Sequence, residues 1–326
     1  MKHITNRKKD FNLEAIVINE FGSADEFYET ELDQPQVTDD TVLVAVNAFS
    51  INPMDVAARL GMLPSQFSSN WKFPLVLGWD FAGTVAKIGK NVTDYQVGDR
   101  VFGSLPNDHA DNNGSYGSYV VAAPETMAKI PAGLSFDQAA ALPIAGGTAY
   151  QAIVENLKVK ANDTVLIQGG AGGVGLFAVQ IAKAQGAKVI ASASPSHHEL
   201  LKQLGADQVI DYHQHAVAKS IKNVDAVFDT AGDIEDGLAA LKAGGKLVTV
   251  GGQPTSEQLN STDKNVAFQF THATTPIYDS LAKLAIAGQL QIKLRTLPRS
   301  ADNVIDAHKT VEGHHMTGKF VIHVKN

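Results

Sequence analysis

The sequence predicts an α/β protein that combines a β-rich first part with a doubly wound, parallel sheet of six strands. Three observations predict this fold class. Short runs of β-branched residues, separated by Gly, Pro and Asp, fill about the first 130 residues. From residue 135 on, apolar strands alternate with helices, a pattern typical of a parallel sheet covered on both faces. A glycine-rich loop joins the first of these strands to the next helix.

The β-rich part is predicted from three runs, at 14–19, 41–46 and 74–88. Turn residues such as Gly98 and Asp99 separate such runs. Short strands with frequent turns are typical of a small barrel or sandwich.

The second part begins at a capping box, in which Ser135 is followed three residues later by Gln138. We expect this box to open a helix that extends towards Leu157. Two later helices should end at glycines, 174–185 at Gly186 and 197–204 at Gly205. Strands are expected at 164–168, 188–192, 208–211, 226–229, 246–250 and 266–270.

The last segment contains predicted helices at 275–287 and 301–312 and a strand at 320–324. This strand has no obvious partner in a parallel sheet of six strands. We therefore expect it to return to the first, β-rich part.

Composition excludes several classes of protein. The chain has 326 residues and a mass of 34.6 kDa, which suggests two domains at about 150 residues each. A net charge of −7 argues against a nucleic-acid-binding protein. The absence of cysteine excludes disulfides, thiolate nucleophiles and cysteine-ligated metals, and fits a reducing cytoplasm. No apolar run approaches the ~20 residues of a membrane helix, so no membrane partner is expected.

The most informative stretch is VLIQGGAGGVG at 165–175, which contains G-x-G-x-x-G at Gly170, Gly172 and Gly175. A predicted strand precedes it and a predicted helix follows, which is the context that this motif requires. We expect Gly170 to allow the tight turn, Gly172 to let the backbone approach a pyrophosphate, and Gly175 to let the helix pack on the strand. The N–H groups at the helix start would favour phosphate. The alternative is a purely structural turn.

The choice between NADH and NADPH depends on the end of the second strand. An NAD site usually has an acidic residue about 20 residues beyond the loop. This chain has Ser194 there, in the sequence ASASPSH at 191–197. A carboxylate ~4 Å from a 2′-phosphate would cost several kcal/mol at an effective dielectric constant of ~20, so its absence favours NADPH. Capping of the next helix is an alternative, compatible role for Ser194.

An ordered series of motifs covers nearly the whole chain. It comprises NPMD at 52–55, PLVLGWDFAGTV at 74–85, VGDRVFG at 97–103, LPIAGGTAY at 142–150, the glycine loop, LGADQVIDY at 204–212 and TGK at 317–319. With these motifs the chain resembles the medium-chain dehydrogenase/reductase superfamily, specifically its zinc-independent quinone oxidoreductase branch. The resemblance implies a GroES-like catalytic domain at 1–134 and 288–326, with a Rossmann NADPH-binding domain inserted at 135–287.

The resemblance also implies a metal-free protein. The positions that hold catalytic zinc in zinc-dependent relatives fall on Asn52, Trp79 and Ile144. None of these is a usual zinc ligand, and no cysteine is present to build a structural zinc lobe. We expect Trp79 to belong to the core or to the wall of the substrate site.

Without zinc, simple alcohol oxidation loses the Lewis acid that polarises the substrate oxygen. A quinone or an α,β-unsaturated carbonyl delocalises charge as hydride arrives, so the predicted reaction is hydride transfer from NADPH to such an acceptor. The resemblance places Asn52 near the nicotinamide, where its amide can donate to a developing oxyanion. The alternative is that Asn52 only orders the loop before Pro53.

The resemblance places Thr148 against the nicotinamide ring. The alternative is that its hydroxyl only bonds a helix carbonyl. Some relatives carry tyrosines five and eleven residues after the Asn, where this chain has Ala57 and Leu63. Tyr150 and Tyr116 are therefore considered as substitute proton donors, beside water.

The remaining expected site residues bind the cofactor. Ser194 and Tyr212 match the family pattern around the 2′-phosphate, and His197 occupies a position that often holds Lys. Gly173, Val174, Gly251 and Lys319 complete the expected cofactor-binding set.

The leading hypothesis is an NADPH-dependent quinone or enone reductase in the cytoplasm. Two alternatives remain open: an enoyl-thioester reductase of the same superfamily, and a catalytically idle NADPH-binding protein. The family commonly dimerises through the edge strands of its Rossmann sheets, so a homodimer that pairs 266–270 is expected.

Overall fold

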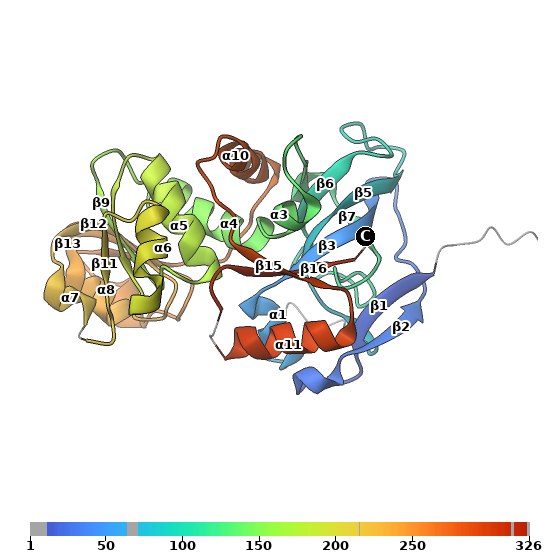
Figure 1. Ribbon diagram of the computed structural model, residues 1–326, viewed down its shortest axis with the longest axis horizontal. Helices are drawn as coiled ribbons and strands as arrows, with labels where there is room; N and C mark the ends of the chain where they lie inside the picture. Colours follow the sequence, from blue (N-terminus) through green and yellow to red (C-terminus); the bar gives the residue numbers. More distant parts are fainter. Residues whose placement is uncertain (1–11, 64–70, 215, 314–315, 325–326) are drawn as a thin grey trace, which may run out of the picture. The chain divides into compact units, whose positions relative to one another are not determined.

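The computed structural model describes residues 12–63, 71–214, 216–313 and 316–324 (Figure 1). The chain divides into two compact units. Unit 1 comprises Met1–Lys129, Thr296–His315 and Phe320–Asn326, and unit 2 comprises Ile130–Arg295 and Met316–Lys319. No described helix is long and apolar enough to cross a bilayer.

Unit 1 is built on a seven-stranded sheet whose longest strand is β3 (Val42–Ile51). Strand β3 pairs antiparallel with β5 (Asp80–Ile88), β7 (Tyr119–Ala122) and β16 (Lys319–His323), so the late strand β16 completes a sheet that begins with early strands. The other strands are β6 (Arg100–Ser104), β8 (Met127–Lys129) and β15 (Leu294–Pro298). The order is β15-β16-β3-β5-β6-β8, and β7 pairs with β3 outside this path.

A three-stranded sheet adds β1 (Leu13–Ile18), β2 (Tyr28–Leu32) and β4 (Leu75–Val76) to unit 1. The expectation of one strand over 74–88 is wrong, because the chain forms β4 and β5 separately. Gly78 lies between them with φ +99°. A Cβ there would lie 2.4 Å from Ser115 Oγ and 2.4 Å from the Tyr116 ring, so the break needs glycine.

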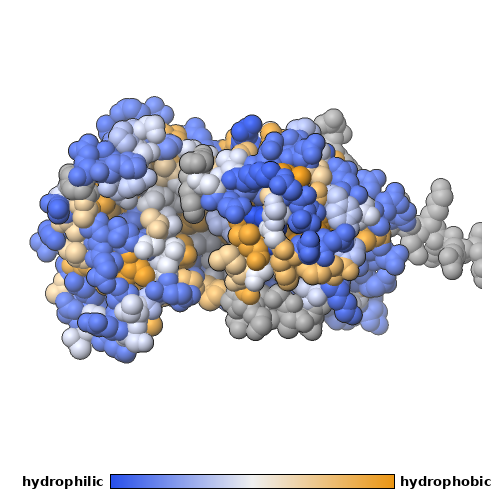
Figure 2. All heavy atoms as spheres, turned by 90° about the horizontal axis from the view of Figure 1, so that it is seen from below, coloured by the Kyte–Doolittle hydropathy of each residue, from blue (hydrophilic) through white to orange (hydrophobic). Residues whose placement is uncertain are grey.

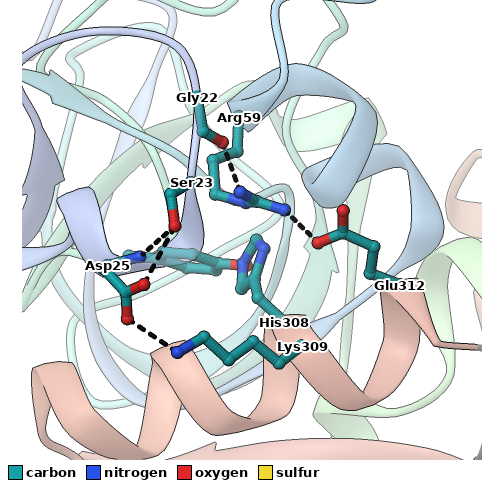
Figure 3. Close-up of polar contacts among 8 residues, drawn as sticks. Gly22, Ser23, Asp25, Arg59, His308, Lys309 and Glu312 are labelled. Carbon is teal, nitrogen blue, oxygen red and sulfur yellow. Dashed lines mark hydrogen bonds and ion pairs between the residues drawn. The ribbon is translucent and has the colours of Figure 1, made fainter.

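Helix α11 (Ala301–Glu312) is fixed in unit 1 by polar contacts at one side (Figure 3). It begins at Ser300, whose hydroxyl accepts from Asn303 N–H, and it lies against α1 (Pro53–Arg59) and the 3₁₀ turn η1 (Ala24–Glu26). Glu312 pairs with the buried Arg59 at 2.5 Å, and Lys309 pairs with Asp25 at 2.7 Å. The guanidinium of Arg59 also donates to the Gly22 carbonyl.

Unit 2 contains six parallel strands in the order β11-β10-β9-β12-β13-β14, which confirms the predicted doubly wound sheet. The strands are β9 (Thr164–Gln168), β10 (Lys188–Ser192), β11 (Gln208–Ile210), β12 (Val224–Asp229), β13 (Leu241–Thr249) and β14 (Asn265–Phe268). Leu166, Val227 and Leu247 come from the three adjacent strands β9, β12 and β13 and are fully buried in the same core cluster. β14 lies at one edge of this sheet.

The predicted capping box is confirmed: Ser135 Oγ accepts from Gln138 N–H, and Gln138 Oε1 accepts from Ser135 N–H. The helix does not continue unbroken, because Pro143 cannot donate a helical hydrogen bond. The segment forms α3 (Phe136–Ala140), α4 (Pro143–Tyr150) and a π-helical stretch at Gln151–Asn156.

The other helices of unit 2 cover its sheet or follow it. They are α5 (Gly173–Ala184), α6 (His198–Gln203), α7 (Val217–Ser220), α8 (Ile234–Ala240), α9 (Ser256–Leu259) and α10 (Thr275–Ile286). The helix expected from His197 instead starts with a 3₁₀ turn, η4 (Pro195–His197), before α6. Gly186 and Gly205 have φ +82° and +109°, as predicted for helix ends.

Hydrophobic residues interrupt the hydrophilic surface on the face that Figure 2 displays. In unit 1, the exposed rings of Phe21 and Phe73 meet edge to face with centroids 5.1 Å apart. In unit 2, Phe268 and Phe270 make a similar contact at 5.3 Å, at the edge strand β14 and just beyond it. Of this second pair, Phe270 is exposed and Phe268 is half-buried.

Candidate functional site

The glycine loop lies between the end of β9 and the start of α5. The positive backbone angle of this loop falls on Gly169, which has φ +73° and whose Cβ would lie 2.5 Å from Thr230 Oγ1. Gly170 lies within the tight turn, because Gly172 N–H donates to the Gly169 carbonyl across it at 3.1 Å. A Cβ on Gly170 would also lie 2.9 Å from the Ala191 Cβ, so packing requires glycine there as well.

Gly175 and Gly172 differ in what surrounds them. A Cβ on Gly175 would lie 2.2 Å from the Gly169 carbonyl oxygen, so this glycine lets α5 approach the loop closely. At Gly172, the residue that precedes α5, a Cβ would meet no atom nearer than that same oxygen at 3.5 Å. The protein's own packing therefore does not require glycine at 172. The space next to Gly172 is open, and it lies beside the N–H groups at the start of a 12-residue helix.

Lys319 lies next to the start of α5. A Cβ on Gly173 would be 3.1 Å from Lys319 Cδ, and Val174 is the next residue of the helix. The Lys319 backbone is held by Lys293, whose carbonyl accepts its N–H at 3.0 Å. The structure thus brings together three residues that the sequence predicts as cofactor ligands, from segments about 145 positions apart.

Strand β10 ends directly beside the glycine loop. Ser192 accepts from Gly170 N–H through its carbonyl, at 2.9 Å, and from Gly169 N–H through its hydroxyl, at 3.3 Å. Two residues further on, Ser194 Oγ lies 2.8 Å from His197 Nδ1. Thr317 Oγ1 lies 2.7 Å from His197 Nε2. The predicted pair Ser194 and His197 is therefore in direct contact, and Thr317, which was not among the predicted site residues, joins it.

Tyr212 and Gly251 lie on two different loops of unit 2, which follow β11 and β13. Tyr212 follows β11, is half exposed, and has its ring 4.2 Å from that of His213. Ala193 N–H donates to the Ile210 carbonyl, so the segment with Ser194 runs beside the end of β11. Gly251 packs on another loop, since a Cβ there would lie 2.4 Å from Gly232 N.

The loop after β12 is organised by a carboxylate that the sequence did not single out. Asp229 Oδ1 accepts from the N–H groups of residues 231, 232 and 233 at 2.9 to 3.2 Å. Its Oδ2 accepts from Thr249 Oγ1 at 2.7 Å. This carboxylate fixes the loop on which Gly251 packs. The sequence carries one signal for this role: Asp229 stands at the end of a strand, and an Asp side chain commonly accepts hydrogen bonds from the backbone of the turn that follows it.

Asn52 belongs to unit 1 and precedes α1. Its Nδ2 donates to Asp80 Oδ2 at 2.9 Å, and Ser50 Oγ donates to the same oxygen at 2.6 Å. Asp55 Oδ2 accepts from Asn52 N–H at 2.5 Å. All four residues are buried, so the amide is oriented from both its side chain and its backbone. Asp55 thus fixes the backbone of the loop at Asn52, and Asp80 fixes the side-chain amide of Asn52.

Trp79 is a core residue. Its ring is fully buried and lies 5.1 Å from the ring of His109 and 6.2 Å from that of Trp71. Ile144 lies half-buried in α4. Among the residues that the structure describes, no three His, Asp or Glu side chains gather closely enough to hold a metal ion.

Thr148 lies buried in α4, and its hydroxyl is 2.7 Å from that of Thr271. Its carbonyl accepts from Gln269 Nε2 at 3.0 Å. Its hydroxyl therefore pairs with another hydroxyl, and not with a helix carbonyl. Tyr150 ends α4 and is half-buried.

Tyr116 is unsuited to donate a proton to a substrate. It is fully buried in unit 1, its hydroxyl is 2.9 Å from His308 Nε2, and burial raises its pKa well above the usual value of tyrosine. Water and Tyr150 remain as candidate donors.

Comparisons with known proteins agree with this fold. Residues 38–132 match the alcohol dehydrogenase GroES-like domain, and residues 173–283 match the zinc-binding dehydrogenase domain. The chain is 34% identical to 2-methylene-furan-3-one reductase of Solanum lycopersicum, over 93% of this chain and 77% of that protein. It is 32% identical to the chloroplastic NADPH-dependent alkenal/one oxidoreductase of Arabidopsis thaliana, over 95% and 79%.

A solved structure, that of the quinone oxidoreductase from Coxiella burnetii, superposes with a TM-score of 0.88. It is 33% identical to this chain, and the alignment covers 97% of this chain and 100% of that one. The chain therefore belongs to the medium-chain dehydrogenase/reductase superfamily, in its quinone oxidoreductase branch, and is an oxidoreductase of that type.

Proposed function

We propose that the chain is an NADPH-dependent, zinc-independent oxidoreductase that transfers hydride to a quinone or an α,β-unsaturated carbonyl. The end of β10 carries this proposal, because Ser194 and His197 occupy the place where a carboxylate would favour NADH. Two similar proteins support the proposal. One is named an NADPH-dependent alkenal/one oxidoreductase, and the other is named a quinone oxidoreductase.

The residues present fit a dinucleotide. The open space at Gly172 and the N–H groups at the start of α5 suit a pyrophosphate, and the Lys319 side chain adds a positive charge beside Gly173. NADPH, when bound, supplies the hydride. In this proposal Gly170, Gly172, Gly173, Val174, Gly175 and Lys319 hold the pyrophosphate, Ser194, His197 and Tyr212 hold the 2′-phosphate, and Gly251 lines the site.

The residues present do not fit a catalytic zinc ion. Of the three positions that carry the ligands in zinc-dependent relatives, Trp79 is a core aromatic residue, Ile144 is aliphatic, and Asn52 is hydrogen bonded to Asp80. Zinc in proteins is held by Cys, His and carboxylate groups. The proposed reaction therefore uses an acceptor whose own conjugation spreads the incoming charge.

Asn52 is assigned the role of stabilising that charge. Its amide donates hydrogen bonds, and Asp80 and Asp55 fix its orientation before substrate binds. A donor that is already oriented costs no reorganisation as the oxyanion forms. Thr148 is assigned to the nicotinamide, and the proton comes from water or from Tyr150.

A homodimer is proposed through β14, the edge strand of the unit 2 sheet. Residues 265 and 267 of this strand are exposed, and Phe270 just beyond it is half exposed. An exposed strand edge offers unpaired backbone groups to another chain, so two copies can extend one sheet across the interface.

The proposed function is tested by NADPH consumption with a panel of quinones, 2-alkenals and enoyl thioesters, followed by absorbance of the reduced cofactor. We expect turnover with quinones or alkenals, and activity that persists in EDTA with no stoichiometric zinc by mass spectrometry. Turnover only with thioesters would establish the enoyl-thioester reductase instead. NADPH binding without any turnover would establish an idle binding protein, and activity that requires zinc would overturn the metal-free assignment.

A further inference from the structure

The His197 ring is held at both of its nitrogens. Nδ1 lies 2.8 Å from Ser194 Oγ and 3.3 Å from Ser196 Oγ, and Nε2 lies 2.7 Å from Thr317 Oγ1. The two serine hydroxyls are 3.2 Å apart. All four residues belong to unit 2, although Thr317 is 120 positions from His197.

Thr317 is itself fixed by the backbone around it. The next residue, Gly318, has φ +80°, and a Cβ there would lie 2.3 Å from the Lys293 carbonyl oxygen. Lys319 N–H donates to that same oxygen at 3.0 Å. The hydroxyl of Thr317 is thus presented to His197 by a constrained segment.

The tautomer of His197 decides what Ser194 can offer to a ligand. A neutral imidazole has one N–H donor and one nitrogen acceptor. If Nδ1 carries the proton, it donates to the serine oxygens, and the serine O–H groups turn outward. If Nε2 carries it, Nδ1 accepts from Ser194, whose lone pairs then face outward. A phosphate needs donors, so Ser194 can bind it only in the first case.

We propose that Thr317 is a positioning residue that selects the phosphate-binding tautomer of His197. Its hydroxyl donates to Nε2, the ring proton therefore stays on Nδ1, and the Ser194 and Ser196 hydroxyls donate to the 2′-phosphate of NADPH. The inference rests on the proposed function, since it explains how a site without Lys or Arg in this turn recognises a phosphate.

The test uses the full chain and two probes, adenosine 2′,5′-bisphosphate and 5′-AMP, with dissociation constants measured by calorimetry. Thr317→Val keeps the shape of the side chain and removes the hydroxyl. We expect it to weaken the bisphosphate about three- to tenfold, the effect of one hydrogen bond, and to leave 5′-AMP unchanged. Thr317→Ser should restore binding. Thr310→Val, the same change at a half-buried position of α11 in unit 1, is the matched control.

A double-mutant cycle distinguishes positioning from direct contact. In a His197→Ala background, the effect of Thr317→Val should disappear, because Thr317 acts through the ring. A loss that persists there, an equal loss for both probes, or no loss in the single variant would overturn the inference. Wild-type protein that binds both probes equally would instead overturn the proposed NADPH preference, and this inference with it.

The tautomer has a direct spectroscopic signature. Two-bond ¹H–¹⁵N spectra of the histidine rings distinguish a protonated from an unprotonated ring nitrogen. We expect His197 to show the proton on Nδ1 in the wild type and a mixture in Thr317→Val. A proton on Nε2 in the wild type would overturn the inference whatever the affinities show.

Discussion

The hydroxyl of Tyr116 lies 2.9 Å from Nε2 of His308 in the interior of unit 1. The two residues are 192 positions apart and fully buried, so their hydrogen bond ties α11 to the loop that precedes β7. Burial, together with a smaller effect of the nearby Arg59, lowers the pKa of His308 to about 3. The contact therefore involves a neutral imidazole at physiological pH.

Buried neutral histidines such as His308 predict that the free energy of unfolding falls at acid pH. Burial also lowers the pKa of His109, to about 4. Both histidines bind a proton in the unfolded chain below a pH of ~6.5 but stay neutral in the folded chain, so the unfolded state binds more protons and stability falls as pH falls. Each contributes up to ~1.4 kcal/mol per pH unit between about pH 6 and 4. Urea unfolding from pH 7 to 5 measures this slope.

Histidine variants show which residue causes this pH dependence of the unfolding free energy. His308→Gln should reduce the pH dependence of the unfolding free energy, whatever it does to stability at pH 7. His272→Gln, at an exposed position of unit 2, should leave the slope unchanged. Identical slopes in His308→Gln and wild type would show that His308 is not the titrating group.

Substitution Ser194→Asp should reverse the coenzyme preference. A carboxylate beside the 2′-phosphate repels it, and the same group accepts the ribose hydroxyl of NADH. We expect NADPH affinity to fall by at least about tenfold and NADH affinity to hold or improve, as measured by fluorescence titration. Ser256→Asp, an equal change of charge on exposed α9, controls for net charge. An unchanged ratio of the two dissociation constants would reject this site.

Substitutions at Gly172 and Gly175 should have different effects, one on cofactor binding and the other on stability. Gly172→Ala adds a Cβ to open space, so we expect the unfolding free energy to change by less than about 1 kcal/mol while NADPH binding weakens about tenfold or more. Gly175→Ala drives a Cβ against the Gly169 carbonyl and should cost roughly 1–3 kcal/mol of stability. Thermal unfolding and calorimetric titration measure the two effects. Normal NADPH affinity in Gly172→Ala would place the pyrophosphate elsewhere.

Substitution Asn52→Ala should lower kcat while leaving the NADPH dissociation constant unchanged. Loss of one preoriented oxyanion donor costs about 10²–10³ in kcat. The expected readout is steady-state kinetics with the best quinone or alkenal, together with a thermal unfolding curve, because Asp80 loses a partner. Asn260→Ala, at the exposed end of α9, is the matched control. A folded Asn52→Ala variant with wild-type kcat would remove Asn52 from the chemistry.

The edge strand predicts the oligomeric state. Light scattering on the wild-type protein should give twice the 34.6-kDa mass of the chain. Ala267→Lys places a charge on the exposed face of β14 and should produce monomers, because edge lysines block strand pairing. Ala287→Lys, an exposed position just after α10, should remain dimeric. A monomeric wild type contradicts the proposal outright.

Local signals explain what the sequence predicts well. The capping box at Ser135, the helix ends at Gly186 and Gly205, and the strand–loop–helix around Gly172 each depend on residues close in sequence. Backbone propensity and short-range hydrogen bonds determine such features, so the residue types alone predict them.

Contacts between distant segments explain what it misses. Asp80 orients Asn52 from 28 positions away, and Thr317 reaches His197 from 120 positions away. Only the strand register and the path of the returning segment bring these groups together. The requirement for glycine at 169 has the same origin, since the side chain of Thr230, 61 positions away, determines it. Strand β15 was missed because most of its residues are polar or exposed.

The returning segment has a consequence for biosynthesis. Strand β3 pairs with β16, and Thr317 and Lys319 stand beside loops made more than a hundred residues earlier. As the ribosome delivers the chain from its N-terminal side, one flank of β3 lacks its partner until residue 323 has emerged. The nascent polypeptide therefore carries an open strand edge through the making of the whole parallel sheet, an interval in which a chaperone has a reason to bind.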